Sequence, residues 1–200
     1  MTNQEDMPWP RKDAKVFAEG KNPLTNVDLQ WLGTLFEDQD ILIAEGFKVV
    51  ADRAVEALER GDEARHPDMY FFPVAYLYRH YLELSLKCLY RDACRFLNGE
   101  VDAEVIIKHN LHKLWNKTKD ALSKSFPQEP PSTLSNVEKV VLQFHRLDPD
   151  GQSLRYAKDT KGKPNLADAP RLIGLTELKN IMDGIGNFFN GCDWALSEGT

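Results

Sequence analysis

Apolar residues recur every three or four positions along most of this chain, which is the spacing of amphipathic helices. The longest such run extends from Met69 to Asn98, and apolar residues cover most of its circumference. Further runs cover residues 26–60, 111–125, 132–147 and 176–196. Because the connecting segments are short, the pattern predicts an all-α fold, an antiparallel helical bundle of four to six helices.

Proline, glycine and capping residues set the expected ends of these helices. Pro73 is expected in the first turn of the central helix, and Asn98-Gly99 is expected to end it. Asn110 is expected to cap the helix that follows, after a short apolar connector at 105–108. The next cap is expected from Ser132, Thr133 or Ser135. Residues 26–60 form either one helix or two, with Gly33 and Asp38 as the possible breaks.

Two segments do not show helical periodicity. Residues 1–23 are polar and contain three prolines, which predicts an N-terminal arm, so that 24–198 form a single helical domain. Residues 151–174 combine an extended stretch with turn residues, which predicts a short extended hairpin or ordered loop inserted before the last helix.

Composition limits the class of protein. The 200 residues are 42% apolar and 28% charged, as in ordinary globular proteins. No run of 18 apolar residues occurs, so we expect no membrane span. The N-terminus lacks a signal-peptide pattern and only three cysteines are present, which indicates a cytoplasmic location; Cys88 and Cys94 should not form a disulfide.

Charge is unevenly distributed along the chain. The net charge is −6, and residues 1–66 hold 8 Lys and Arg against 14 Asp and Glu, whereas the rest of the chain is balanced. Residues 108–124 contain five lysines and one acidic residue, Asp120. This distribution argues against a general nucleic-acid coat but allows a local basic face.

A charged stripe crosses the apolar central helix. His80, Glu83 and Lys87 are expected on one face of the helix, and Arg79 stands four residues before Glu83. They form either solvated ion pairs at an edge or a buried polar cluster in which Glu83 positions His80 or binds a cationic group. The apolar residues on both sides leave little helix surface for solvent and favour the second interpretation.

Two more segments carry candidate chemistry. His109 and His112 could join His80 and Glu83 as metal ligands, but the spacing is a weak signal, and we expect no metal and no cofactor. Arg155 and Tyr156, followed by three lysines, could grip a phosphate and stack on a base. A solvated hairpin is the alternative for this last segment. No phosphate-binding glycine loop, nucleophile elbow or paired CxxC motif is present.

The order of these motifs resembles a known family. A helix with Arg-His-Tyr-Leu-Glu-Leu-Ser-Leu-Lys precedes His-Asn-Leu, and Asp-Pro-x-x-x-Ser-Leu-Arg-Tyr then precedes a final helix. This order resembles bacterial members of the HEPN superfamily (higher eukaryotes and prokaryotes nucleotide-binding) over about 70–194. The resemblance implies a bundle of four or five helices, frequent dimerisation and a role near RNA or nucleotides, often in bacterial defence or toxin–antitoxin systems.

The chain departs from the family's RNA-cleaving motif. That motif is an arginine followed, after four to six residues, by a histidine at a helix start. Leu84, Ser85 and Leu86 stand at those positions after Arg79, so the histidine is missing. Arg60 and His66 have the right separation, but Gly61 and Pro67 indicate a loop there.

These observations give a set of expectations. The chain is expected to bind RNA, a nucleotide or a protein partner, and to form a homodimer. If it is an enzyme, it resembles a ribonuclease with His80 and Glu83 as catalytic residues. The alternatives are a catalytically inert dimeric interaction module and, less favoured, a metal-binding helical-bundle enzyme. His80, Glu83, His109 and Arg155 should lie within reach of one another. The residues expected to bind ligand or phosphate are Arg79, Lys87, His109, Arg155 and Tyr156.

Overall fold

The computed structural model describes residues 22–25, 27–28, 39–62, 66–128, 130–167 and 169–198. The chain divides into two units, Met1–Glu37 and Asp38–Thr200. The described part of the first unit holds a short 3₁₀ helix, η2 (Pro23–Thr25), where the Asn22 side chain accepts a hydrogen bond from the Leu24 amide. The expected end of the arm, between Pro23 and Leu24, lies within η2. Of the helical run expected at 26–60, residues 39–59 are helix α2, and the possible breaks at Gly33 and Asp38 lie outside the described residues.

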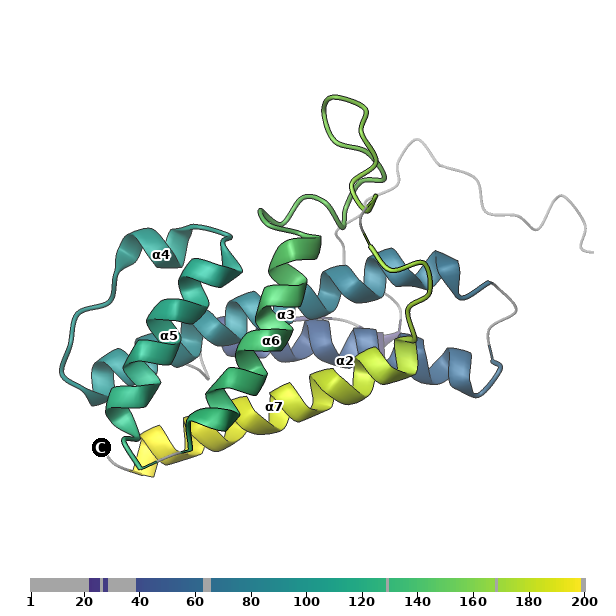
Figure 1. The fold of residues 1–200 in the computed structure, drawn as a ribbon. Helices are drawn as coiled ribbons and strands as arrows, with labels where there is room; N and C mark the ends of the chain where they lie inside the picture. The colour runs from purple at the N-terminus through teal and green to yellow at the C-terminus, as the bar shows by residue number, and fades with distance from the viewer. Residues whose placement is uncertain are drawn as a thin grey trace, which may run out of the picture. The chain divides into compact units, whose positions relative to one another are not determined.

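The second unit confirms the all-α fold. Its described residues form helices and no β-strand, and the fold is drawn in Figure 1. The helices are α2 (Gln39–Glu59), α3 (Asp68–Phe96), α4 (Ala103–Ile107), α5 (Leu111–Ser125), α6 (Pro131–Leu147) and α7 (Leu175–Glu198).

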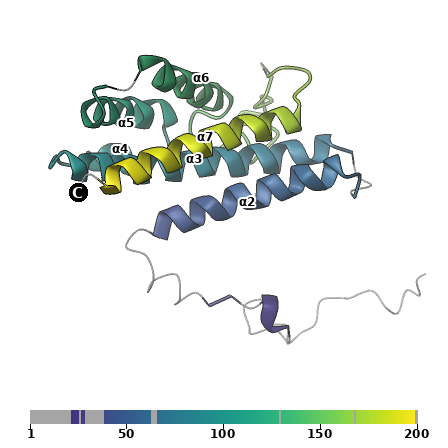
Figure 2. The same ribbon diagram turned by 90° about the horizontal axis from the view of Figure 1, so that it is seen from below.

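Helix α3 is the centre of this unit. It contacts α2, α5 and α7, while α6 packs on α5. Figure 2 shows α2 on one side of α3 and the α5–α6 pair on the other. Because α3 has neighbours on several faces, 15 of its 29 residues are buried, among them Tyr78, Leu82 and Leu86. This arrangement explains why apolar residues cover most of its circumference.

Several element boundaries differ from the expectations. Pro73 lies inside α3, beyond the first turn, because the helix begins at Asp68. The expected connector at 105–108 is instead mostly helix α4, capped by the Asp102 side chain, which accepts from the Glu104 amide at 3.1 Å. Helix α6 begins after Pro130 without a side-chain cap, so the fixed proline φ, rather than a hydroxyl group, sets its start.

Other local expectations are confirmed. Helix α5 spans 111–125, and the Asn110 side chain caps it by accepting from the Lys113 amide at 2.9 Å. Helix α3 ends just before Asn98, which has a φ of 52°. Cys88 and Cys94 are free thiols.

The segment between α6 and α7 is an ordered loop. Figure 1 shows it rising beside the C-terminal end of α6, near the N-terminal end of α5. One antiparallel bridge joins Lys158 and Pro164, and the Asp159 carboxylate accepts from the amides of Lys161 and Lys163 at 2.8 and 2.9 Å. Among the described residues of this segment, the extended pairing that the sequence predicts is therefore limited to this single bridge.

Candidate functional site

The charged stripe of α3 is buried. Arg79, Glu83 and Lys87 follow one another at intervals of four residues, so they share one face of the helix. This face lies under the start of α5 and the turn after α6, and Arg79 and Glu83 are each only 1% exposed. Since isolated buried charges cost several kcal/mol each, the stripe requires partners inside the protein.

Glu83 is the acceptor at the centre of this stripe. Its Oε2 accepts from Arg79 Nη1 at 2.8 Å, and its Oε1 lies 2.8 Å from Lys87 Nζ and 2.7 Å from His109 Nδ1. Burial raises the pKa of the Glu83 carboxyl, but hydrogen bonds from Lys87 and Arg79 outweigh that effect and lower the pKa to about 2. Glu83 is therefore an ionised carboxylate at neutral pH.

Arg79 joins α3 to two distant segments. Its Nη2 donates to the His109 carbonyl at 2.7 Å, and its Nε donates to the Asp148 carbonyl at 3.1 Å. The Asp148 carboxylate is also 3.1 Å from Nε and is fully buried. We call Arg79, Glu83, Lys87 and Asp148 the buried cluster. It contains two cations and two anions, so its formal charge balances.

The buried cluster also fixes the loop that follows α6. Asp148 Oδ1 accepts from the Ser153 amide at 2.8 Å. Gly151 has a φ of +80°, and a Cβ atom there would lie 3.4 Å from Arg79 Nη1. The chain therefore turns sharply over the guanidinium group before it leaves as the exposed loop.

His109 is the exposed end of the buried cluster. Its side chain is 58% exposed, although Nδ1 is bonded to Glu83 and its backbone carbonyl to Arg79. An ionised carboxylate can only accept hydrogen bonds, so Nδ1 carries the hydrogen of this pair. The neutral ring then has its lone pair on Nε2.

His80 lies apart from this arrangement. Its ring is 4.5 Å from the Phe47 ring of α2 and stacks on Tyr76 at 5.8 Å, measured between ring centroids. Burial lowers the pKa of His80, the charge of Glu83 raises it, and Arg79 lowers it further. Within the described residues His80 has no hydrogen bond to Glu83, so Glu83 positions His109 instead.

The remaining predicted residues divide into buried and exposed sets. Arg79 and Lys87 use their donors on protein groups inside the cluster rather than facing solvent. Arg155 and Tyr156 are exposed in the loop, where the guanidinium carbon lies 5.7 Å from the ring centroid of Tyr156 and the guanidinium group bonds the Gln152 side chain. Of the four residues expected together, the structure joins Glu83 and His109.

Sequence reasoning missed the role of Asp148. It stands in an Asp-Pro-Asp-Gly turn, which signals the end of α6, but that pattern does not indicate that the carboxylate turns inward to an arginine. The sequence also did not predict that His112 and His145 lie together. The rings of His112 and His145 are 5.7 Å apart, and burial together with His112 and Arg79 lowers the pKa of His145.

A second group of charged residues joins α2, α3 and α7. Lys48 Nζ donates to Asp52 at 2.7 Å and to Asp183 at 2.5 Å, and the Tyr78 hydroxyl donates to Asp52 at 2.7 Å. Lys179 adds a 3.0 Å bond to Asp183. Burial opposes ionisation of Asp183, but the hydrogen bonds from Lys48 and Lys179 lower its pKa. We call Lys48, Asp52, Asp183 and Lys179 the rim cluster.

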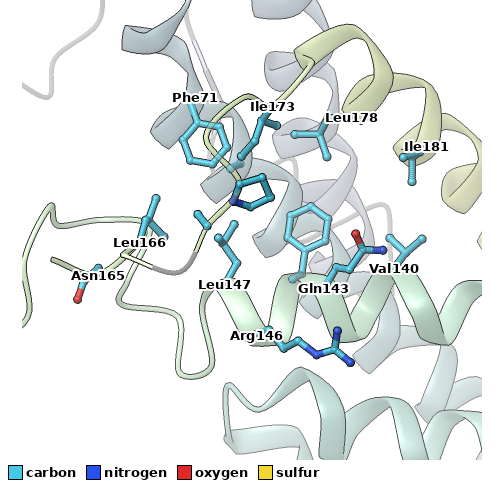
Figure 3. Close-up of a pocket in the computed structure, with 14 residues that line it drawn as sticks. Phe71, Val140, Gln143, Arg146, Leu147, Asn165, Leu166, Ile173, Leu178 and Ile181 are labelled. Atoms are coloured by element: carbon cyan, nitrogen blue, oxygen red, sulfur yellow. The ribbon is translucent and has the colours of Figure 1, made fainter.

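An apolar pocket of about 490 Å³ lies between α3, α6, α7 and the segment before α7, as Figure 3 shows. Asn165 belongs both to its wall and to the base of the loop, since the Asn165 side chain donates to the Tyr156 carbonyl at 2.7 Å. The labelled apolar side chains come from all of these elements: Phe71, Val140, Leu147, Leu166, Ile173, Leu178 and Ile181.

Comparison of the chain with protein-family models, curated proteins and solved structures found no match. In the described ranges, no helix has both the length and the hydropathy needed to cross a bilayer. The same residues contain no group of three or more His, Cys, Asp or Glu placed to hold a metal ion.

Proposed function

We propose that this chain is a HEPN-like helical domain that binds single-stranded RNA at the exposed surface beside the buried cluster. We call this surface the loop face; it consists of His109, Arg155, Tyr156, Lys158, Lys161 and Lys163. The observation that carries the proposal is an exposed Arg155–Tyr156 pair and three lysines on a loop that is fixed to α3 through Asp148.

The charge of the loop favours an anionic ligand. Residues 149–166 contain four Lys and Arg against two acidic residues, and Asp159 is occupied by backbone amides of the loop itself. Lys158, Lys161 and Lys163 are exposed, and none makes an ion pair with any described residue. Such uncompensated cations attract phosphates and release counterions when they bind.

The aromatic residue favours single strands. Tyr156 is 59% exposed, and the arginine beside it supplies a planar cation. Unpaired bases stack on such rings, whereas bases inside a duplex are not available. The resemblance to the HEPN superfamily points to the same class of ligand, and it alone suggests a homodimer and a place in a bacterial defence or toxin–antitoxin system.

Fluorescence anisotropy with a labelled oligo(U) strand tests this proposal. Charge reversal in Lys161→Glu should weaken binding several-fold and reduce the salt dependence by about one phosphate contact. Tyr156→Ala should cost about 1–3 kcal/mol of binding free energy through lost stacking. Lys124→Glu is the matched control, because Lys124 is exposed and its ion pair with Asp120 lies at the opposite end of α5.

If the wild-type chain binds no strand, or if Lys124→Glu weakens binding as much as Lys161→Glu, the loop face is not the RNA site. The inert interaction module is then the better interpretation. The complete charge balance of the buried cluster favours that second candidate, since a cluster of this kind can also serve only to specify how helices pack. Light scattering of the purified chain measures its oligomeric state in either case.

A further inference from the structure

A small cavity lies where α2, α3 and α7 meet, and it shares no residue with the loop face or the buried cluster. Its volume is about 110 Å³, well above the roughly 10–15 Å³ that one water molecule needs. Its lining includes one carboxylate from each of the three helices and no lysine, arginine or histidine. The three carboxylates belong to Glu45, Asp92 and Asp193. We call this space the acidic cavity.

The carboxylates of the acidic cavity are only weakly compensated. Glu45 and Asp193 make no ion pair with any described residue. Asp92 is 2.9 Å from Arg95, but the Arg95 side chain is 69% exposed, so solvent screens much of this attraction. The lining therefore carries a net negative charge that favours a positively charged ligand.

The groups beside the lining do not cancel this charge. Arg91 Nη2 is 3.6 Å from Cys88 Sγ in the cavity wall, but the same nitrogen is 2.7 Å from Asp40, whose carboxylate offsets it. Burial, and after it the charge of Glu45, raise the pKa of the Tyr81 hydroxyl. The negative charge of Glu45 thus acts on the inner wall of the cavity.

A buried hydroxyl also lines the acidic cavity without a hydrogen bond. Within a helix a hydroxyl often donates to the carbonyl four residues earlier, as Thr118 does to Leu114 at 2.9 Å. Ser85 is only 3% exposed, yet its Oγ makes no hydrogen bond with any described residue. Ser85 opposes the rise that burial causes in the pKa of Tyr81, so the two hydroxyls are close, but their geometry is not that of a hydrogen bond. Because a buried hydroxyl without a partner costs free energy, Ser85 favours a ligand that supplies a donor.

We propose that the acidic cavity binds the primary ammonium group at one end of a short aliphatic diamine or polyamine. An ammonium group has three donors that point in different directions, which suits carboxylates on three helices and the Ser85 hydroxyl. A planar guanidinium group instead prefers two parallel bonds to one carboxylate. The rings of Tyr81 and Phe189, 6.1 Å apart between centroids, add aromatic surface beside the cation, and Ile41 and Leu89 add apolar surface for methylene groups. This site is independent of the RNA binding proposed above.

Isothermal titration calorimetry with 1,4-diaminobutane at constant ionic strength tests the proposal. The wild-type chain should bind one diamine, and its unfolding temperature should rise with the diamine concentration. 1,4-Butanediol has a similar length but no charge and should not bind. The hexamethylated diammonium compound, bis(trimethylammonium)butane, keeps both charges but has no N–H donor, so it should bind at least about tenfold more weakly.

Three variants test the residues of the acidic cavity. Ser85→Ala should weaken binding about tenfold through loss of one hydrogen bond to a charged group, without destabilising the free chain. Asp193 is exposed, so Asp193→Lys should fold normally, and its own ammonium group should abolish binding. Glu177→Gln is the matched control. It removes an exposed carboxylate of the same helix, about 24 Å from Asp193 at 1.5 Å per residue, and should bind like wild type.

Each contrary outcome overturns the proposal. Absence of diamine binding by wild type removes the site. Equal binding of the hexamethylated compound, or equal weakening in Glu177→Gln and Asp193→Lys, would mean that the diamine is only a counterion of an acidic surface. An unchanged affinity in Ser85→Ala would place the bound amine outside the acidic cavity. RNA binding at the loop face stands or falls separately from all of these results.

Discussion

The buried cluster and the rim cluster each contain two basic and two acidic residues, but they differ in what these residues bind. In the rim cluster, Lys48, Asp52 and Asp183 connect side chains of three helices and remain 13%, 17% and 39% exposed. In the buried cluster, the side chains of Arg79 and Glu83 are 2% and 1% exposed, and they also bind backbone carbonyls and an exposed histidine. The rim cluster links packed helices. The buried cluster holds surface segments in place, although burying its charges costs free energy.

The strongest way to test this difference is to neutralise one acid in each cluster. Among the described residues, Glu83→Gln leaves the buried Lys87 without an anionic partner and leaves Arg79 with Asp148 alone, so it should reduce the free energy of unfolding by about 3–5 kcal/mol. Asp183→Asn removes a partly exposed charge and leaves Lys48 paired with Asp52, so it should cost about 1 kcal/mol or less. Urea unfolding followed by circular dichroism measures both. Equal losses would remove the distinction between the two clusters.

The next largest effect is expected from acid, acting on Glu83 of the buried cluster. The pKa of the Glu83 carboxyl is about 2 in the folded chain, compared with the ordinary value of 4.5 that applies to the unfolded chain. The stabilisation by Glu83 is therefore complete above pH 4.5 and is lost as the pH falls toward 2, because the unfolded chain takes up the proton first. Over this interval the stability difference between wild type and Glu83→Gln should shrink. A difference that stays constant in urea titrations at successive pH values would contradict the depressed pKa.

The smallest effect is expected from the lysines. Lys87→Met and Lys48→Met keep most of the aliphatic side chain and remove one ammonium group each. Glu83 keeps Arg79 and His109 after the first change, and Asp52 and Asp183 keep Tyr78 and Lys179 after the second. Each variant should therefore lose only about 1 kcal/mol in thermal or urea unfolding. A loss of 3 kcal/mol or more in Lys87→Met would mean that Lys87, rather than Arg79, is the main partner of Glu83.

Local signals explain which parts of the fold could be predicted. Helix α5 follows from Asn110 as its cap and from apolar residues such as Leu114 and Trp115 at helical spacing, both of which are fully buried. Helix α4 has only five residues, too few for a periodic pattern, and its only signal was the capping residue Asp102. Short helices of this kind depend on contacts that the sequence does not reveal.

The candidate site could be predicted only in part, because the sequence shows local spacing but not tertiary contacts. The spacing of Arg79, Glu83 and Lys87 within apolar neighbours required partners, but it could not identify them. Asp148 lies 69 residues beyond Arg79, and only the tertiary fold brings the two together. His80 was expected to face Glu83, yet it is directed toward Phe47 of α2. His80 is one position after Arg79, and one position along a helix rotates the side-chain direction by about 100°, so the two side chains point to different neighbours.

The bonds of Arg79 have a consequence for the order of folding. They close loops of 30 residues to His109 and 69 residues to Asp148, and bringing such distant segments together costs chain entropy before any contact is gained. Helix α3 and its near neighbours can therefore assemble first, and the guanidinium group acquires its last partners only when α6 has docked. Amide hydrogen exchange should show Ser153 opening with α6 as one unit, ahead of the amides at the centre of α3.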